Sequence, residues 1–219
     1  FDFCGGCVIG KSDGKTSDMT VFTEVKDLES VIEYAKSLPY TNEKDITLVG
    51  CSQGGFVSAL VASKRAEEIS NLILFYPALC IPEDARNGNM LGTTFDPNNI
   101  PEILKFGSIK IGKDYPASAA KIDAYKEIKK FTKDVLILHG TADSIVQLKY
   151  SKHAYNEYIQ ERQNACEKHP VEFEIIKNGK HGFSKKHDKI AIQHVKNFLE
   201  KSHHNHHHKH CHKKRRNPI

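Results

Sequence analysis

A serine lies between two glycines in the segment GCSQG, residues 50–54, which fits the pattern G-x-S-x-G. A short apolar run, residues 46–49, precedes it, and apolar residues at helical spacing follow from position 56. In a tight turn from a buried strand into a helix, the serine hydroxyl is exposed above the sheet and the helix N–H groups face any negative charge that develops beside it. We therefore predict that Ser52 is a nucleophile; the alternative is a Gly/Ser turn without chemistry.

A serine nucleophile needs an imidazole base and a carboxylate that orients it, because the hydroxyl is barely ionised at neutral pH. Asp143 follows the apolar run 134–140, and His181 follows the run 171–179. Taken singly, an aspartate here fits a turn and a histidine fits a solvated loop. Taken together, they stand in the chain order Ser, Asp, His after three strands, so we predict that they meet at one edge of a sheet.

The elements that must position these residues alternate along the chain between buried strands and amphipathic helices. This alternation predicts an α/β fold with a mostly parallel sheet and helices on both faces. The expected strands are residues 46–49, 71–79, 134–140 and 171–179, after a strand end at residues 1–3; the expected helices are 22–38, 53–65, one between the last two strands, and 187–200.

Residues 80–130 interrupt this alternation with four prolines and several glycines. The stretch is too long for a plain connection. We interpret it as a cap inserted over the carboxyl ends of the strands, where open α/β sheets bind ligands. The alternative is a loosely packed surface excursion.

The charge of the chain is uneven. Residues 203–219 hold five of the 32 Lys and Arg residues and no acidic residue, which leaves 27 basic and 27 acidic residues elsewhere. This neutral body argues against a nucleic-acid-binding protein, and no apolar run reaches the roughly 18 residues of a membrane span. We expect a core at residues 1–201 and a disordered His/Lys/Arg-rich tail at 202–219, which could also bind divalent metals weakly or polyanions.

The six cysteines form no evident disulfide framework. Cys51 and Cys80 are expected to be small buried apolar residues. Cys4 and Cys7 match C-x-x-C, but a loop follows instead of a helix, so redox or metal chemistry is not expected there. We expect no metal and no cofactor.

The segments "FDFCGG", "GCSQGG", "LHGTAD" and "KHGF" make the sequence similar to α/β-hydrolases, and within them to the bacterial-type cinnamoyl (feruloyl) esterases. The resemblance runs from residue 1 to about residue 200, and "PEDARNGNMLGTTFDPNNIP" and "IKIGKDY" resemble the inserted subdomain of those esterases. It implies that Asp84 and Tyr115 hold the phenolic hydroxyl of a hydroxycinnamate. The alternative is that Asp84 caps a turn and Tyr115 packs under the loop.

The resemblance further implies a carboxylesterase that works through an acyl-enzyme on a small-molecule ester, with hydroxycinnamates as the implied class. The oxyanion would be bound by the backbone N–H of Gln53 and by a second N–H from the loop after the third strand. No His-Gly loop of that kind lies upstream of Ser52, so we expect a truncated chain with weakened catalysis and stability. The segment "FDFCGGCVIGKSDG" is also longer than in some relatives.

Two other functions stay open at this stage. One is a serine peptidase of the prolyl-oligopeptidase or aminopeptidase branch, and the other is a catalytically weak pseudo-hydrolase that serves as a binding module. A homodimer and a cytoplasmic location are compatible with the sequence, which decides neither.

Overall fold

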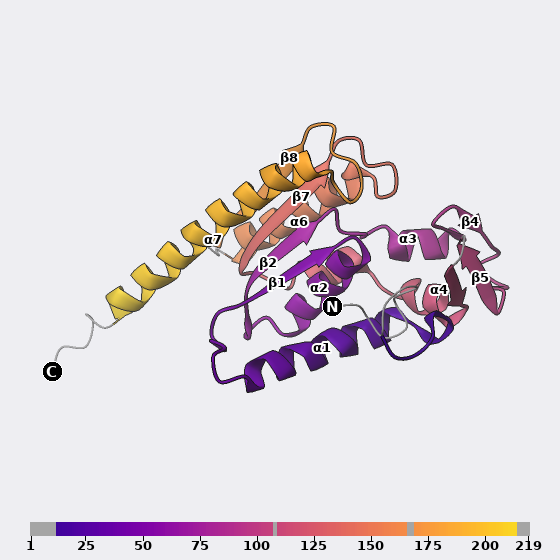
Figure 1. The fold of residues 1–219 in the computed structure, drawn as a ribbon, viewed down its shortest axis with the longest axis horizontal. Helices are drawn as coiled ribbons and strands as arrows, with labels where there is room; N and C mark the ends of the chain where they lie inside the picture. The colour runs from indigo at the N-terminus through magenta and orange to yellow at the C-terminus, as the bar shows by residue number, and fades with distance from the viewer. Residues whose placement is uncertain (1–11, 107–108, 166–168, 214–219) are drawn as a thin grey trace.

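Four parallel strands form the central sheet in the order β1-β2-β7-β8 (Figure 1). The computed structural model describes residues 12–106, 109–165 and 169–213. The predicted strand 71–79 ends earlier, because Tyr76 turns the chain at φ 37° and Pro77 has no N–H to donate. The strand bounds are Ile46–Cys51 for β1, Ile69–Phe75 for β2, Asp134–Gly140 for β7 and Val171–Ile176 for β8.

The sheet is covered by helices on both faces, as the sequence predicts. Leu72 and Leu74 of β2 belong to a large core with α1 (Val21–Ser37), α2 (Gln53–Lys64) and α6 (Leu148–Ala165). Ile73, between them, points to the opposite face and packs with α7 (Lys185–Lys213). Alternate residues of β2 thus face two apolar layers, which explains its continuous apolar run.

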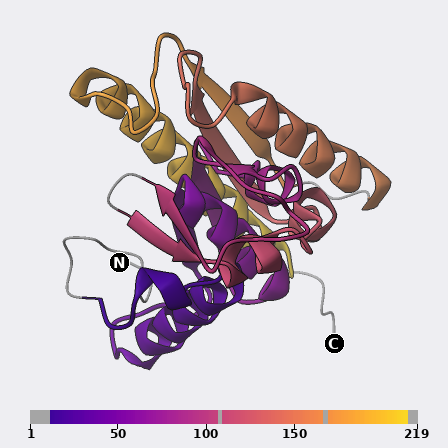
Figure 2. The same ribbon diagram turned by 90° about the vertical axis from the view of Figure 1, so that its right-hand side faces the viewer.

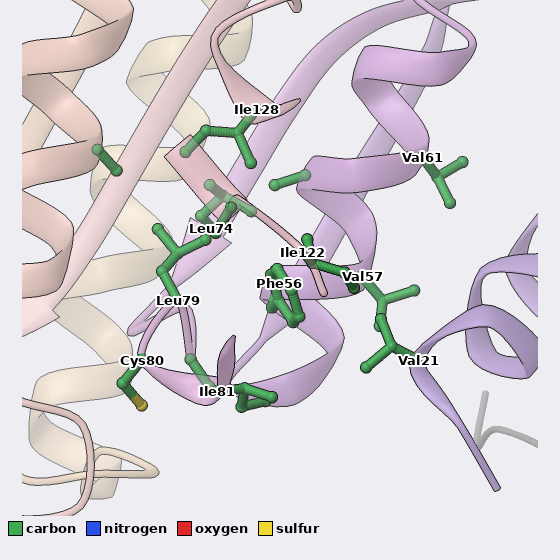
Figure 3. Close-up of a cluster of buried hydrophobic side chains, with 14 of the residues drawn as sticks. Val21, Phe56, Val57, Val61, Leu74, Leu79, Cys80, Ile81, Ile122 and Ile128 are labelled. Carbon is green, nitrogen blue, oxygen red and sulfur yellow. The ribbon is translucent and has the colours of Figure 1, made fainter. Parts of the chain in front are cut away.

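Helix α1 begins with a capping box, in which the Thr20 and Thr23 side chains bind each other's backbone N–H groups. Leu28 and Ile32 then bury its inner face, whereas Val31, next to Ile32 in the chain, is 37% exposed. Figure 3 shows the core in which α1 and α2 meet the residues that follow β2; it includes Val21, Phe56, Val57, Val61, Leu74, Leu79, Ile81, Ile122 and Ile128.

Residues 81–128 are here called the inserted segment, and its described residues from 81 to 119 gather at one end of the molecule (Figure 1), seen from that end in Figure 2. Met90, Leu104, Ile111 and Tyr115 are buried and belong to the main core, so this segment is packed onto the body. Its elements are α3 (Ile81–Arg86), the hairpin β3 (Asn89–Met90) and β4 (Thr93–Thr94), the hairpin β5 (Ile103–Phe106) and β6 (Ile109–Gly112), α4 (Asp114–Ala119) and α5 (Ala124–Ile128); a short helix η1 (Thr16–Asp18) precedes α1.

Helix α7 corrects our expectation for the end of the chain. We expected a helix at 187–200 and disorder from residue 202, but α7 continues to Lys213. Its first half is anchored by the buried ring of Phe198, and the buried hydroxyl of Ser202 donates a 2.6 Å hydrogen bond to the Asn71 side chain on β2. This anchor lets a polar helix propagate past the end of the sheet (Figure 1).

The cysteines give one correction. Cys80 is buried as expected, but Cys51 is exposed, because it shares the outward-facing positions of β1 with Val49. The strand end expected at residues 1–3 and the C-x-x-C pair at Cys4 and Cys7 lie outside the described residues. Within those residues, no helix is long and apolar enough to cross a bilayer, and no cluster of three or more ligating side chains could hold a metal ion.

Candidate active site

Ser52 occupies the turn between β1 and α2 in a strained conformation, with φ 52° and ψ −121°. The backbone around it is fixed, because Ser52 N–H donates to Phe75 O and Ser52 O accepts from Ala78 N–H. A side chain cannot replace the first glycine of the motif, since a Cβ at Gly50 would lie 2.4 Å from the Gly54 carbonyl oxygen. The Ser52 hydroxyl does not cap α2 and is left for other partners.

His181 and Asp143 meet Ser52 at the carboxyl edge of the sheet. The Ser52 Oγ atom lies 2.9 Å from His181 Nε2, and His181 Nδ1 lies 2.8 Å from Asp143 Oδ2. Because a carboxylate oxygen only accepts, Nδ1–H donates to Asp143, and neutral Nε2 is free to accept the Ser52 proton. The Asp143 side chain is 1% exposed and that of His181 is 16% exposed. The structure therefore brings together the three residues that the sequence predicts as a triad.

Asp143 is held by more than His181. Its Oδ1 atom accepts from the backbone N–H groups of Ile145 and Val146, each at 2.9 Å. Its Oδ2 atom also lies 3.2 Å from Nε2 of His139, a fully buried residue of β7. These contacts fix the orientation of the carboxyl group, which suits a partner that orients an imidazole.

The hydrogen bonds of His139 define its tautomer. Nε2 lies 2.9 Å from the Val146 carbonyl oxygen, which can only accept, so Nε2 carries the proton. Nδ1 then accepts from the Ser151 hydroxyl at 2.7 Å. Burial lowers the pKa of His139, so this second histidine is neutral and supports the loop that carries Asp143. The sequence signal that we missed is the position of His139 within the apolar run 134–140, which forms the fully buried strand β7.

Two glycines join the loops that carry the acid and the histidine. A Cβ at Gly140 would lie 2.0 Å from the Gly179 carbonyl oxygen, so the two backbones touch. The Gly179 carbonyl also accepts a 2.9 Å hydrogen bond from Ala142 N–H. Ala142 directly precedes Asp143, and Gly179 stands two residues before His181. The close approach ties the positions of Asp143 and His181 to each other.

Aromatic rings pack beside the histidine. The Tyr76 ring centroid lies 4.7 Å from that of His181 and 5.0 Å from that of Phe183. Burial raises the pKa of Tyr76 to about 12, so its phenol is neutral at physiological pH. The rings limit the rotation of His181 without adding a charge.

A cavity of about 520 Å³ opens beside Ser52 and extends under the inserted segment. This volume is typical of a site for a small organic ligand. Most of its wall is apolar, and its larger apolar side chains are Ile81, Met90, Leu91, Ile111, Ile145 and Val146. Asp84 and Tyr115 line the same cavity, so the structure brings both predicted substrate residues to one cavity with Ser52.

Asp84 and Tyr115 differ in their surroundings. Burial raises the pKa of Asp84, which lies beside the thiol of Cys80. The Tyr115 ring is 2% exposed; its hydroxyl accepts from Gln53 Nε2 at 2.9 Å and donates to Glu24 Oε2 at 3.3 Å. A tyrosine oxygen has two lone pairs, so one remains available for a ligand in the cavity.

Glu24 is a residue of the site that the sequence interpretation missed. It is fully buried on α1, and its carboxyl accepts from the Gln53 amide as well as from Tyr115. Gln53 directly follows Ser52, and its backbone N–H is the first of α2. Glu24 stands four residues before Leu28 in the buried stripe of α1, and a carboxylate in such a stripe is the signal that could have revealed it.

Comparisons with known proteins agree with this fold. A family model described as serine aminopeptidase, S33, matches residues 9–108. A structure of Est1E from Butyrivibrio proteoclasticus with ferulic acid bound is 33% identical, with a TM-score of 0.81, and the match covers 92% of this chain and 75% of that one. This chain belongs to the α/β-hydrolases. The α/β-hydrolase fold expected from the sequence is thereby confirmed.

Two further structures resemble this α/β-hydrolase. A second structure of Est1E is 31% identical, with a TM-score of 0.75, over 84% of this chain and 72% of that one. The alpha/beta hydrolase domain-containing protein 10 from mouse is 21% identical, with a TM-score of 0.65, over 92% of this chain and 76% of that one. At that identity, the mouse protein supports the shared fold alone.

Proposed function

We propose that this α/β-hydrolase is a serine carboxylesterase that cleaves cinnamoyl or feruloyl esters through an acyl-enzyme. The observation that carries the proposal is the unbroken chain of hydrogen bonds from Ser52 Oγ to His181, at 2.9 Å, and from His181 to Asp143, at 2.8 Å. A nucleophile, a base and an orienting carboxylate at these distances suit acyl transfer.

In the proposed mechanism, Ser52 Oγ attacks the ester carbonyl carbon while His181 Nε2 takes the hydroxyl proton. Asp143 holds the imidazole tautomer and stabilises the imidazolium that forms. The tetrahedral intermediate collapses, and His181 gives its proton to the leaving alcohol. A water molecule then attacks the acyl-Ser52 ester with His181 again as the base, which releases the carboxylic acid and restores the serine.

The backbone N–H of Gln53 would bind the oxyanion of the tetrahedral intermediate. It follows the nucleophile directly and belongs to the first residue of α2, where the helix dipole is positive. Loss of one such donor in other serine hydrolases costs about 10²–10³ in kcat.

The cavity supports an aromatic acyl group. Its apolar walls can hold a cinnamoyl ring, and Asp84 and Tyr115 can hydrogen-bond a hydroxyl on that ring. The ferulic acid bound to Est1E, which is 33% identical, gives independent support for this ligand class.

The test is a substrate panel that contains methyl ferulate, methyl cinnamate, a p-nitrophenyl butyrate ester and leucine p-nitroanilide, with Ser52→Ala as the control. We expect the esters to be hydrolysed, methyl ferulate with the highest kcat/KM, and Ser52→Ala to lose about 10³-fold or more. Activity that persists in Ser52→Ala would overturn the serine mechanism.

The panel also tests a second function, which the match to the serine aminopeptidase family model favours. A preference for leucine p-nitroanilide over all esters would replace the esterase with a peptidase. Failure to turn over any substrate, or to react with a fluorophosphonate at Ser52, would favour the third reading, a pseudo-hydrolase that binds its ligand without cleaving it.

A substitution at Tyr115 tests the substrate class. Tyr115→Phe removes the hydroxyl from the cavity wall and also breaks its hydrogen bond with Gln53, so we expect kcat/KM to fall about tenfold more for methyl ferulate than for p-nitrophenyl butyrate. Tyr125→Phe is the matched control, since the Tyr125 hydroxyl donates to Tyr150 O instead. Equal losses on both esters would remove Tyr115 from the substrate site.

A further inference from the structure

Glu24 is a fully buried carboxyl beside the nucleophile turn. It lies at 0% exposure in the first turn of α1, and none of the ion pairs formed among the described side chains includes it. Its hydrogen-bond partners are the Gln53 amide on α2 and the Tyr115 hydroxyl on α4. A carboxyl buried without a cation is far more stable protonated than ionised.

The hydrogen bonds of Glu24 form a closed three-residue cluster. Gln53 Nε2 donates both to Glu24 Oε1 and to the Tyr115 hydroxyl, at 2.9 Å, and Tyr115 donates to Glu24 Oε2 at 3.3 Å. Gln53 immediately follows Ser52, and Tyr115 lines the cavity. The cluster therefore connects the nucleophile turn, the inserted segment and α1 through polar contacts that are buried or partly buried.

We propose that Glu24 is a positioning residue for the proposed ester hydrolysis, which holds Gln53 and Tyr115 in place and must be uncharged to do so without opposing the oxyanion. The inference rests on the proposed function. Glu24 does not contact the substrate in this proposal. It acts through Gln53, whose backbone N–H would bind the oxyanion.

The charge requirement follows from the reaction. Attack by Ser52 places a negative charge near the Gln53 N–H. A second negative charge on Glu24, in a buried environment of low dielectric constant, would slow formation of that oxyanion by about tenfold or more. A neutral Glu24 avoids this repulsion and keeps a hydrogen bond with each of the two partners.

The neighbouring groups place the ionisation of Glu24 in an accessible pH range. Its pKa is raised to about 8: burial is the largest cause, the hydrogen bonds from Gln53 and Tyr115 lower the pKa, and the nearby Asp27 on α1 raises it. Helix α2 contributes only the uncharged Gln53 amide. The pKa of Tyr115, on α4, is itself raised by burial and by Glu24, so Tyr115 stays neutral in the range where Glu24 ionises.

The experiment compares the pH dependence of kcat/KM for methyl cinnamate, which has no ionisable phenol, in four proteins from about pH 6 to about pH 10. Wild type should lose activity by about tenfold as the pH rises past about 8. Glu24→Ala should be about 10–100-fold less active at neutral pH, because Gln53 and Tyr115 lose a partner. Glu24→Gln should rescue most of that loss and lack the alkaline fall.

Glu33→Gln is the matched control, because it removes a carboxyl from the same helix at a side chain that is 59% exposed. Its pH profile should follow that of wild type. An alkaline fall that persists unchanged in Glu24→Gln, or a Glu24→Ala variant with wild-type kcat/KM, would overturn the proposal.

Two measurements separate this proposal from the proposed function. If no ester is hydrolysed but a fluorophosphonate labels Ser52, the substrate class is wrong, and the pH dependence of the labelling rate tests Glu24 in the same four proteins. If Ser52 is not labelled at all, both proposals fail. Infrared spectra should also show a protonated carboxyl at neutral pH that is absent in Glu24→Gln; without this band, the uncharged Glu24 is refuted.

Discussion

Gly140→Ala is the sharpest test of how the fold positions His181. The new Cβ would lie 2.0 Å from the carbonyl oxygen of Gly179 and 2.4 Å from its carbon, whereas ordinary contacts begin at 3.4 Å. The two backbones must therefore separate by more than about 1 Å. The Ala142 to Gly179 hydrogen bond crosses the same point, so the loops that carry Asp143 and His181 move apart.

The expected cost has two parts. Overpacking of this kind destabilises a protein by about 1–3 kcal/mol, which urea unfolding measures directly. A displacement of about 1 Å between catalytic groups costs about 100-fold in rate, so kcat/KM for p-nitrophenyl butyrate should fall by that factor in protein that is still folded.

Gly112→Ala provides a control with an equal clash in another place, since its Cβ would lie 2.0 Å from the Ser17 carbonyl oxygen. It should lose a similar amount of stability and retain the rate on this short ester. A folded Gly140→Ala enzyme with a wild-type rate would refute the inference that the contact with Gly179 positions His181.

Three further outcomes are expected. His139→Ala leaves the Val146 carbonyl and the Ser151 hydroxyl buried without a partner, so it should cost about 2–4 kcal/mol in urea unfolding and at least about tenfold in kcat/KM. The pKa of Glu24 is raised from 4.5 to about 8, chiefly by burial. The protonated carboxyl therefore stabilises the fold fully below pH 4.5, and this stabilisation is lost as the pH rises through about 8. Relative to Glu24→Gln, the free energy of unfolding of wild type in urea should fall by about 3–5 kcal/mol over that range. Ser202→Ala removes the buried hydrogen bond to Asn71 and should cost about 1–2 kcal/mol while ester hydrolysis is unchanged, which would confirm that α7 is docked there.

The sheet and the relative placement of the three predicted triad residues were predictable from the sequence. Strands buried on both faces appear as continuous apolar runs, and β7 has the predicted bounds. Parallel strands bring their carboxyl ends to one edge, so a serine, an aspartate and a histidine that each follow such a run must lie near one another. Pattern and topology suffice for that step.

The burial of Glu24 and the exposure of Cys51 depend on packing between segments that are distant in the sequence, and local sequence patterns do not reveal such packing. A glutamate in a helix is usually solvated; this one is buried because α2 and α4 both pack on α1 at that turn. Cys51 follows a buried run, yet it falls on the exposed side of β1. In both cases the deciding neighbour is far away in the sequence.

The end of α7 shows a third limit. A His/Lys/Arg-rich tail with very few apolar residues was expected to be disordered, because such a composition buries little surface. A helix that is already nucleated elongates at little cost, however, and Phe198 and Ser202 supply the anchor from which it continues.

The pairing of β2 with β7 has a consequence for the chemistry. Ser52 follows β1, whereas Asp143 and His181 follow β7 and β8, so β2 separates the strand of the nucleophile from the strands of the acid and the base. Main-chain hydrogen bonds from Ser52 to Phe75 and from Tyr76 to Leu138 carry this alignment past the strand ends. A slip of one residue along a strand is about 3.3 Å, more than the whole 2.9 Å gap from oxygen to nitrogen. The distance over which the Ser52 proton is transferred thus depends on the backbone of β2, a strand that contributes no reactive side chain.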